Sequence, residues 1–311
     1  MINQYHSNGK LLLTGEYLVL QGAEALALPL KKGQTLRVKP IRESDRLIWQ
    51  SVYNGKIFFE AVYAFDNLRI VQTNNEELAR FLQKLLRKAW GYLPSFIRKT
   101  TGYFIETFLS FPLEWGLGSS STLISNLSDW LDVNPFILNH DITNGSGYDI
   151  ACAKSNRPII YKTSGQNPEY REIDISLPFR DQIYFVYTGK KQQSAKEVEK
   201  FNARQDQHHH LFREIHDINN QIINSRKLGD FEKAIRDHER IIAGVLDSKP
   251  IQERYFPGFP GTIKSLGAWG GDFILVTWQG TREELHQYFK PHGMDIIFTW
   301  DELIKNKEHA G

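Results

Sequence analysis

Two glycines and three consecutive serines stand between an apolar strand and an apolar helix, and this junction restricts the possible folds of the chain more than any other feature. Residues 112–122 read Pro-Leu-Glu-Trp-Gly-Leu-Gly-Ser-Ser-Ser-Thr. Residues 103–110 before them are typical of a strand, and residues 123–131 after them are typical of a helix. Glycine lets the backbone approach a ligand closely, and the free amides at a helix start suit phosphate. The junction therefore predicts a phosphate-binding loop; the alternative is a loop that only caps the helix.

The same loop excludes two common nucleotide-binding folds. It is not a Walker A motif, because no Gly-Lys-Ser/Thr ends it, and its glycine spacing differs from the Rossmann fingerprint. Strands and helices along the chain are mixed without strict alternation, which favours an α+β fold over a doubly wound sheet.

Composition sets broader limits. The chain has 311 residues, enough for about two domains. Its formal net charge of +2 gives no indication of binding to nucleic acid or to a membrane surface. The single cysteine, Cys152, excludes an intramolecular disulfide. No apolar run approaches the length of a membrane span and no signal peptide is evident at the N-terminus. We therefore expect a cytoplasmic protein.

Local patterns predict the following elements. Strands are expected at residues 10–19, 35–40, 47–49, 56–63, 103–110, 159–162, 182–188, 272–278 and 295–299. Helices are expected at residues 76–92, 123–131 and 282–289, and through the charged region 194–246 with a break near residues 227–230. A capping box of Thr281 and Glu284 starts the helix at 282. The polar, proline-containing stretch 164–178 is the expected domain boundary.

Three further segments carry residues suited to chemistry. Asn8-Gly-Lys10 leads into a strand followed by Gly-Glu16-Tyr17; Lys10 is either functional or an ordinary surface lysine. Gly145-Ser-Gly-Tyr-Asp149 places one carboxylate beside a small apolar segment, where partial burial can suit it for proton transfer; the alternative is a helix cap. Residues 264–272 read Lys-Ser-Leu-Gly-Ala-Trp-Gly-Gly-Asp, either a functional glycine-rich turn or a simple tight one.

Taken together, the order and spacing of these four segments resemble the GHMP kinases, the family of galactokinase, homoserine kinase, mevalonate kinase and phosphomevalonate kinase. Residues 112–122 are similar to its phosphate loop, Pro-x-x-x-Gly-Leu-Gly-Ser-Ser-Ala, and residues 267–272 to its third motif. The Gly-Tyr-Asp and Gly-Gly-Asp variants look most similar to the mevalonate and phosphomevalonate branch. The resemblance implies a ribosomal-S5-like ATP-binding domain over residues 1–178 and a ferredoxin-like domain over residues 179–311, with ATP and acceptor in the cleft between them.

The resemblance also implies roles for individual residues. The triphosphate would be held by Gly116, Leu117, Gly118, Ser119, Ser120 and Ser121, and Ser120 would ligate Mg²⁺. Asp149 would face the acceptor hydroxyl as base or orienting group, and Lys10 would pair with Asp149 and polarise that hydroxyl. Gly270 and Gly271 would close the site from the other domain. Phosphoryl transfer needs mainly positioning and charge neutralisation, which such groups supply.

Two features depart from the family pattern. Relatives in the mevalonate kinase branch carry an acidic Mg²⁺ ligand between the phosphate loop and the catalytic Asp. Here that stretch offers only Asp129, Asp132 and Asp141, of which Asp141 is nearest to the expected place. Trp269 stands where the family has glycine, and its indole would narrow the acceptor pocket or block it.

The second domain opens with a basic loop. Lys190, Lys191 and Ser194 could hold an acceptor carboxylate or phosphate; the alternative is a solvated loop. The run His208-His209-His210 is not expected to bind a metal, because consecutive helical residues point about 100° apart.

These observations favour an ATP- and Mg²⁺-dependent kinase that acts on a small anionic alcohol or its phosphomonoester, and we expect mevalonate or phosphomevalonate as the acceptor. The alternative is a catalytically silent protein of the same fold that binds a ligand or regulates a partner. A third possibility is diphosphomevalonate decarboxylase, which shares the fold and the use of ATP. The sequence does not predict the oligomeric state.

Overall fold

The computed structural model describes residues 2–41, 45–92, 102–143, 145–163, 168–189, 201, 208–267 and 271–306. The chain forms two compact units that are each discontinuous in sequence. Unit 1 is Met1–Gly9, Lys32–Pro112 and Gly118–Lys154, and unit 2 is Lys10–Lys31, Leu113–Leu117 and Ser155–Gly311. Over the described residues, no helix combines the length and the apolar character needed to cross a bilayer.

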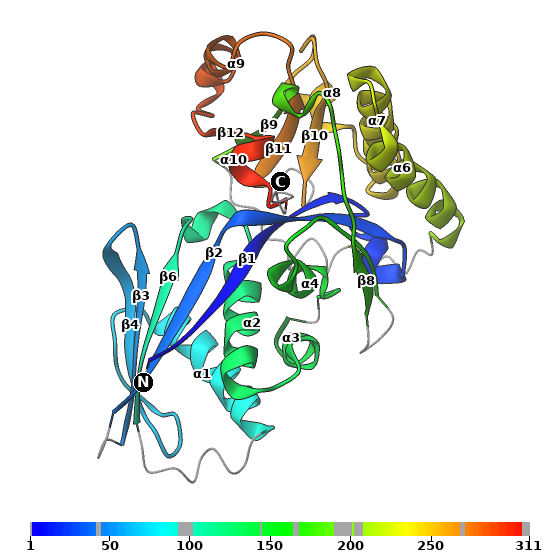
Figure 1. The fold of residues 1–311 in the computed structure, drawn as a ribbon. Helices are drawn as coiled ribbons and strands as arrows, with labels where there is room; N and C mark the ends of the chain where they lie inside the picture. The colour runs from blue at the N-terminus through cyan, green and yellow to red at the C-terminus, as the bar shows by residue number, and fades with distance from the viewer. Residues whose placement is uncertain are drawn as a thin grey trace, which may run out of the picture. The chain divides into compact units, whose positions relative to one another are not determined.

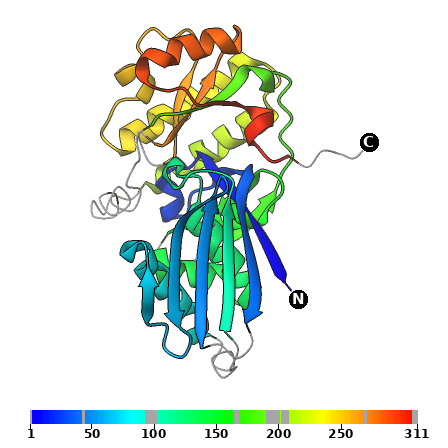
Figure 2. The same ribbon diagram turned by 90° about the vertical axis from the view of Figure 1, so that its left-hand side faces the viewer.

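Unit 1 is a sheet covered by helices. Its complete strands are β3 (Arg46–Tyr53), β4 (Lys56–Ala64), β5 (Ile70–Thr73) and β6 (Gly102–Leu109), and it also contains the first part of β1 (Asn3–Thr14) and the last part of β2 (Ala25–Ile41). Its helices are α1 (Glu76–Gly91), α2 (Ser119–Leu131), α3 (Pro135–Thr143) and α4 (Tyr148–Lys154). The strands lie in the order β5-β4-β3-β6-β2, and β1 also pairs with β2. Strands β3 and β6 are parallel, whereas the pairs β3–β4, β4–β5 and β2–β6 are antiparallel. Helices α1 to α3 lie on one face of this sheet (Figures 1 and 2).

The core of unit 1 follows from alternation on the strands and helical spacing on α1. Leu82, Leu85 and Leu86 of α1 are buried together with Trp49 of β3 and Ile105 of β6. Asn75 caps α1 by accepting a hydrogen bond from the amide of Leu78 at 3.1 Å. The predicted helix at residues 76–92 and strand at 103–110 are therefore confirmed to within about a residue at each end.

Unit 2 contains a four-stranded antiparallel sheet. The four strands of this sheet are β9 (Ile183–Tyr187), β10 (Ile263–Leu266), β11 (Phe273–Thr277) and β12 (Ile297–Thr299), and the unit also contains β7 (Ile159–Lys162) and β8 (Glu169–Glu172), which pair with each other. Its helices are α6 (Phe212–Asn224), α7 (Leu228–Val245), α8 (Ile251–Tyr255), α9 (Arg282–Phe289) and α10 (Trp300–Leu303), with short 3-10 helices η1 (Leu18–Gln21), η2 (Leu113–Trp115), η3 (Arg180–Gln182), η4 (His209–Leu211) and η5 (Lys290–His292).

The sheet order is β10-β11-β9-β12, and every neighbouring pair is antiparallel. With α6 and α7 between β9 and β10, and α9 between β11 and β12, the connectivity is β-α-β-β-α-β (Figure 1). Helix α9 begins with the predicted capping box, since the side chain of Thr281 accepts from the amide of Glu284 and the reverse bond is also formed. Helix α9 and strand β12 were thus both predictable from local signals.

The division into units differs from the predicted boundary between residues 178 and 179. Strand β2 belongs to both units, because residues 34–41 pair with β6 and residues 25–27 pair with β7. The segment Leu113–Leu117 joins unit 2, although its neighbours in sequence belong to unit 1. Long-range pairings of this kind cannot be predicted from the local composition of the sequence. The division into two domains at residues 178 and 179 stays a prediction.

Candidate functional site

The glycine-serine loop has the backbone geometry that its sequence predicts. Gly116 and Gly118 have φ angles of 64° and 94°, a region that favours glycine. Helix α2 begins at Ser119, and its hydrogen bonding starts with the amide of Thr122 donating to the carbonyl of Gly118 at 2.9 Å. The amides of Ser119, Ser120 and Ser121 precede that first bond, so they lie at the open end of the helix. This arrangement suits an anion.

The three serine hydroxyls have different roles. Ser121 is buried and its hydroxyl donates to the carbonyl of Gly118 at 2.9 Å, which closes the first turn of α2. The side chain of Ser120 is exposed and that of Ser119 is half-buried. Ser120, the predicted Mg²⁺ ligand, is therefore the hydroxyl at this helix start that solvent reaches most readily.

A buried polar network holds α2 in unit 1. The hydroxyl of Ser7 on β1 donates to Ser125 at 2.8 Å and to the side-chain oxygen of Asn126 at 2.9 Å. Asn126 in turn donates to the carbonyl of Gln34 at 2.9 Å. Buried groups satisfied in this way fix an element at a defined position. The loop is therefore followed by a helix start that cannot easily shift.

Lys10 is bound to the loop through both its main chain and its side chain. Its amide donates to the carbonyl of Leu117 at 3.0 Å, and its ammonium group donates to the carbonyl of Gly116 at 2.9 Å. The side chain of Leu117 is fully buried. The first and second sequence motifs thus meet at the first half of the loop, and Lys10 brings a positive charge to a place where phosphate is expected.

Asp272 is a site residue that the sequence analysis did not select. A Cβ atom at Gly116 would lie 2.6 Å from Cγ of Asp272 and closer still to one of its carboxylate oxygens, so a side chain at residue 116 would require this carboxylate to move. The amide and hydroxyl of Thr188 donate to the carbonyls of Asp272 and Gly271 at 2.9 and 3.0 Å. The third motif therefore also meets the loop at Gly116.

Aromatic side chains hold the segment before the loop. The ring of Trp115 lies 5.7 Å from Tyr187, 5.9 Å from Phe273 and 5.5 Å from Phe298, measured between centroids. The Tyr187 hydroxyl donates to the carbonyl of Glu114 at 3.4 Å. The pairs with Phe273 and Phe298 are edge-to-face, a geometry that stabilises a contact beyond the area it buries. Trp115 thus fixes the residue before Gly116 on the sheet of unit 2.

Asp149 lies in the first turn of α4 and is partly buried. The amide of Ile150 donates to its carboxylate at 3.0 Å, and the amides of Ile150 and Ala151 both donate to the carbonyl of Gly147. Asp149 lies inside helix α4 and not at its N-cap, so it is not the capping residue of this helix in the usual sense. Its predicted pairing with Lys10 stays a prediction.

Asp141, the predicted acidic Mg²⁺ ligand, is already engaged in unit 1. The hydroxyl of Tyr92 donates to its carboxylate at 2.5 Å, and the ammonium group of Lys88 lies 3.7 Å away. This hydrogen bond raises the pKa of the Tyr92 hydroxyl. The carboxylate faces α1, so ligation of a metal would require it to leave both partners.

The two other acids of that stretch are also committed. Asp129 forms an ion pair with Lys154. Asp132 ends α2 with a φ of 54°, as its C-cap. None of these three acids has the surroundings of a carboxylate that is poised for a cation.

Several predicted residues of the acceptor site lie outside the described residues, namely Lys190, Lys191, Ser194, Trp269 and Gly270. Gly271 is described and buried, and its amide donates to the hydroxyl of Ser265 at 3.3 Å. Gly267 has a φ of 77°, as the predicted glycine-rich turn requires.

A second group of charges in unit 2 is fully buried. The ammonium group of Lys264 lies 2.6 Å from Oε1 of Glu16 and 3.6 Å from Oε1 of Glu239. His238 is beside them, since its Nε2 accepts a hydrogen bond from the amide of Gly15 at 2.9 Å and lies 3.3 Å from Oε2 of Glu16. These residues tie the end of β1 to α7 and β10.

The buried group holds two carboxylates and one lysine, so the charges do not balance if both acids ionise. Burial raises the pKa of Glu16 to about 7, although Lys264 opposes this shift. Burial also raises the pKa of Glu239 and lowers the pKa of His238. Oε2 of Glu16 is buried without a hydrogen-bond partner. A proton on Glu16 would leave one carboxylate and one lysine in the group, so that the charges balance, which agrees with the direction of its pKa shift.

The donor set fits a cation that takes most of its ligands from a bound nucleotide. Among the described residues, no group of three or more His, Cys, Asp or Glu side chains could hold a metal by itself. Mg²⁺ commonly uses one or two protein ligands together with phosphate oxygens and water. The hydroxyl of Ser120 in unit 1 and the carboxylate of Asp272 in unit 2 are each, by themselves, groups of a kind that Mg²⁺ accepts as ligands. His209 and His210 lie in η4, and His208 is the N-cap of this short helix.

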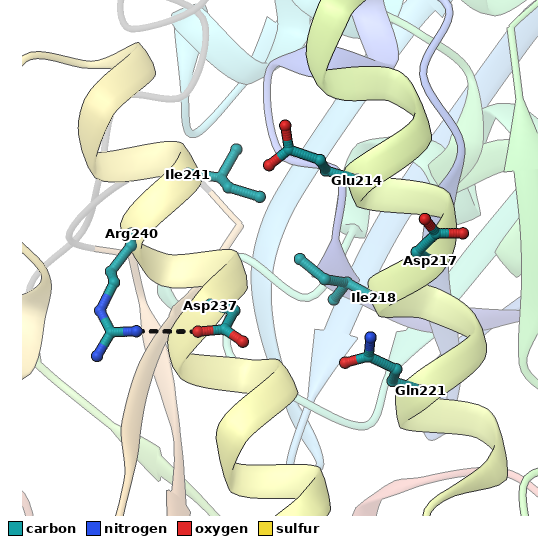
Figure 3. Close-up of a pocket in the computed structure, with 7 residues that line it drawn as sticks. All are labelled: Glu214, Asp217, Ile218, Gln221, Asp237, Arg240 and Ile241. Atoms are coloured by element: carbon teal, nitrogen blue, oxygen red, sulfur yellow. Dashed lines mark hydrogen bonds and ion pairs between the residues drawn. The ribbon is translucent and has the colours of Figure 1, made fainter.

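A hollow between α6 and α7 lies in another part of unit 2. It has a cavity volume of about 410 Å³ and is lined by Glu214, Asp217, Ile218, Gln221, Asp237, Arg240 and Ile241. Asp237 accepts a hydrogen bond from Arg240 at 2.9 Å (Figure 3). None of the predicted site residues lines it, so it takes no part in the candidate site.

Comparison with known proteins places the fold. No protein-family model matches the chain. A curated mevalonate kinase from Methanocaldococcus jannaschii is 21% identical over 302 residues, which cover 90% of this chain and 94% of that protein. The crystal structure of the Methanococcus jannaschii mevalonate kinase matches with a TM-score of 0.70 at 19% identity, over 99% of this chain and 98% of that one.

Two other kinases have similar structures. Streptococcus pneumoniae phosphomevalonate kinase in complex with phosphomevalonate and AMPPNP matches with a TM-score of 0.70 at 15% identity, over 96% of this chain and 99% of that one. Lactococcus lactis galactokinase complexed with galactose matches with a TM-score of 0.60 at 14% identity, over 94% and 89%. These structural similarities confirm that the fold is the one expected from the sequence motifs.

Proposed function

We propose that this chain, which has the fold of the GHMP kinases, is an ATP- and Mg²⁺-dependent kinase that transfers the γ-phosphoryl group to mevalonate or phosphomevalonate. One observation carries the proposal: Lys10 and Asp272, from two motifs far apart in sequence, both meet the loop at Gly116. A mixed α+β fold alone would not bring these residue types together at a glycine with positive φ. The ribosomal-S5-like and ferredoxin-like descriptions of the two domains belong to the same proposal.

In this mechanism the loop from Gly116 to Ser121 binds the triphosphate through its backbone amides. The ammonium group and the amide of Lys10 donate to the carbonyls of Gly116 and Leu117, so both carbonyl oxygens already have a hydrogen-bond donor. Lys10 also neutralises charge that develops on the transferred group. Bound Mg²⁺ would supply further charge neutralisation, with Ser120 as one ligand.

Asp149 acts on the acceptor. A free hydroxyl must lose its proton as it attacks phosphorus, and a carboxylate within hydrogen-bond reach can accept that proton. A phosphomonoester acceptor needs less help, because its second pKa is about 6 and it is already ionised near neutral pH. It needs cations instead, which Lys190 and Lys191 would supply. The two acceptors therefore make different demands on the same site.

A catalytically silent, ligand-binding protein is the alternative. The engagement of Asp141 by Lys88 and Tyr92 favours it, since this removes the acid that the family pattern predicts as a metal ligand.

A panel of acceptors tests the proposal. ADP formation is measured with ATP and Mg²⁺ in the presence of mevalonate, phosphomevalonate or diphosphomevalonate, and carbon dioxide is measured in parallel. We expect ADP that depends on one of the first two acceptors, without carbon dioxide. Carbon dioxide from diphosphomevalonate would instead identify a decarboxylase. ATP binding without turnover on any acceptor would support the silent alternative.

A further inference from the structure

The position of Asp272 raises an electrostatic problem if the loop binds ATP. The carboxylate lies against Gly116, the first glycine of the loop, and hydrogen bonds from Thr188 to the carbonyls of residues 271 and 272 hold its backbone in place. Two like charges 4 Å apart repel by about 1 kcal/mol even in bulk water, and by more near a protein surface. A triphosphate carries several such charges. A negative side chain here would oppose binding unless a cation lies between the two.

Lys10 supplies only part of the compensation. Its ammonium group is 2.9 Å from the carbonyl of Gly116, so one positive charge is present at the same glycine. One lysine cannot balance both a carboxylate and a triphosphate. A divalent cation can, and Mg²⁺ prefers carboxylate and phosphate oxygens as ligands.

The other acidic candidates are less well placed. Asp141 is engaged by Lys88 and Tyr92, and Asp129 is paired with Lys154. Asp272 differs from both in lying against the loop itself. A side chain at residue 116 would require the carboxylate to move from this position.

From this geometry we propose that Asp272 is a carboxylate ligand of the Mg²⁺ that accompanies ATP, in place of an acid between the loop and Asp149. The inference rests on the proposed function, since it presupposes that the loop binds a nucleotide. The metal neutralises the carboxylate and the phosphates together, so Asp272 helps binding when Mg²⁺ is present and opposes it when Mg²⁺ is absent.

That change of sign gives the test. The dissociation constant of a non-hydrolysable ATP analogue is measured by calorimetry with excess Mg²⁺ and again with EDTA, for the native protein and for Asp272→Asn. The substitution keeps the shape of the side chain and removes its charge. We expect Asp272→Asn to weaken binding at least tenfold with Mg²⁺, and to leave it unchanged or strengthen it severalfold with EDTA.

Two further variants make the result specific. Glu114→Gln removes one exposed negative charge two residues before Gly116, so it controls for general electrostatics; we expect a small effect of the same sign in both conditions. Asp141→Asn tests the competing ligand. Electron paramagnetic resonance of Mn²⁺ with the analogue gives a second measurement, and we expect Asp272→Asn to release Mn²⁺ that the native complex holds.

Several outcomes would overturn the inference. Equal weakening by Asp272→Asn in both conditions would show that the side chain only supports the loop. No change in either condition, or strengthening in both, would remove it from metal binding. A selective loss with Asp141→Asn alone would assign the metal to Asp141. Native protein that binds no analogue in either condition would instead overturn the proposed function, and the inference with it.

Discussion

Unit 2 places two lysines in contrasting surroundings. Lys10 is half-buried, and its ammonium group donates to a backbone carbonyl beside the glycine-serine loop. Lys264 is fully buried between Glu16 and Glu239. The carbonyl that Lys10 contacts is neutral and does not compensate the positive charge of the lysine. The charge of Lys264 is compensated by the carboxylates beside it. The comparison teaches that charge in this unit has two uses, one for binding at the loop and one for holding strands and helices together.

The largest expected effect comes from breaking the buried group. Lys264→Ala leaves two buried carboxylates without their cation, and removal of one partner of a buried ion pair typically costs about 3–5 kcal/mol. Urea denaturation measures the free energy of unfolding. Lys10→Ala serves as the matched variant, with an expected loss of about 1 kcal/mol, because the side chain is only half-buried and its ammonium group donates to a neutral backbone carbonyl. Similar losses for both lysines would contradict the comparison.

Asp149→Asn tests the residues that are proposed to act in the reaction, in contrast to those that hold the fold together. With mevalonate as the acceptor, we expect turnover to fall at least about 100-fold, which corresponds to about 2.7 kcal/mol, because the amide cannot accept the proton of its hydroxyl. ATP affinity should change little, since Asp149 acts on the acceptor. Steady-state kinetics and calorimetry separate the two quantities. Near-normal turnover in the folded variant would show that Asp149 has no such role.

The buried group also predicts a pH dependence of stability. The pKa of Glu16 is raised in the fold to about 7 from an ordinary value of 4.5. Its contribution to stability is therefore present below pH 4.5 and is lost as pH rises toward 7, by up to roughly 1.4 kcal/mol per pH unit. Glu239, whose pKa is also raised, acts in the same direction. His238, with a lowered pKa, acts oppositely and gains stability as pH rises toward 6.5.

Glu16→Gln isolates the contribution of one group. Glutamine stays neutral and leaves Lys264 paired with Glu239. Between pH 5 and 7 we expect the free energy of unfolding of the native protein to fall by about 2 kcal/mol relative to the variant. Parallel pH profiles for the two proteins would mean that Glu16 is ionised throughout this range.

The smallest expected effect concerns the acceptor. If the acceptor is a phosphomonoester, Lys190→Ala combined with Lys191→Ala should raise its KM at least tenfold, about 1.4 kcal/mol, and leave the KM for ATP nearly unchanged. The double variant Lys227→Ala and Lys249→Ala removes the same charge from exposed positions and should leave both values unchanged. Turnover of mevalonate alone, indifferent to Lys190 and Lys191, would leave these lysines as a solvated loop.

Local signals in the sequence predicted the elements whose formation depends on local pattern. The helical pattern over residues 76–92 predicted α1, and Thr281 with Glu284 predicted the start of α9. The loop residues were predicted correctly as a strand-loop-helix junction, with glycines where φ is positive. Each of these features is determined within a few neighbouring residues.

Features that depend on distant contacts were missed. The strand predicted to continue to Val19 ends at Thr14, because Gly15 and Tyr17 adopt positive φ and Leu18–Gln21 forms η1. Residues 264–266 of strand β10 were interpreted as part of a turn. The burial of Lys264 in this strand depends on its ion pair with Glu16, which is 248 positions away in the sequence. The contact of Asp272 with Gly116 has the same character. A charged residue inside an apolar stretch, as at Lys264, is the one signal that could have indicated a buried ion pair.

Phosphorus NMR of ATP turnover tests the central claim most directly. Native protein is mixed with ATP, Mg²⁺ and either mevalonate or phosphomevalonate, and the spectra follow ATP, ADP and the acceptor together. The account predicts that the γ-phosphoryl signal moves from ATP to one of these acceptors as an equal amount of ADP appears, and that Asp149→Asn slows this transfer. Bound ATP that stays intact with both acceptors, or that yields only inorganic phosphate, would contradict it.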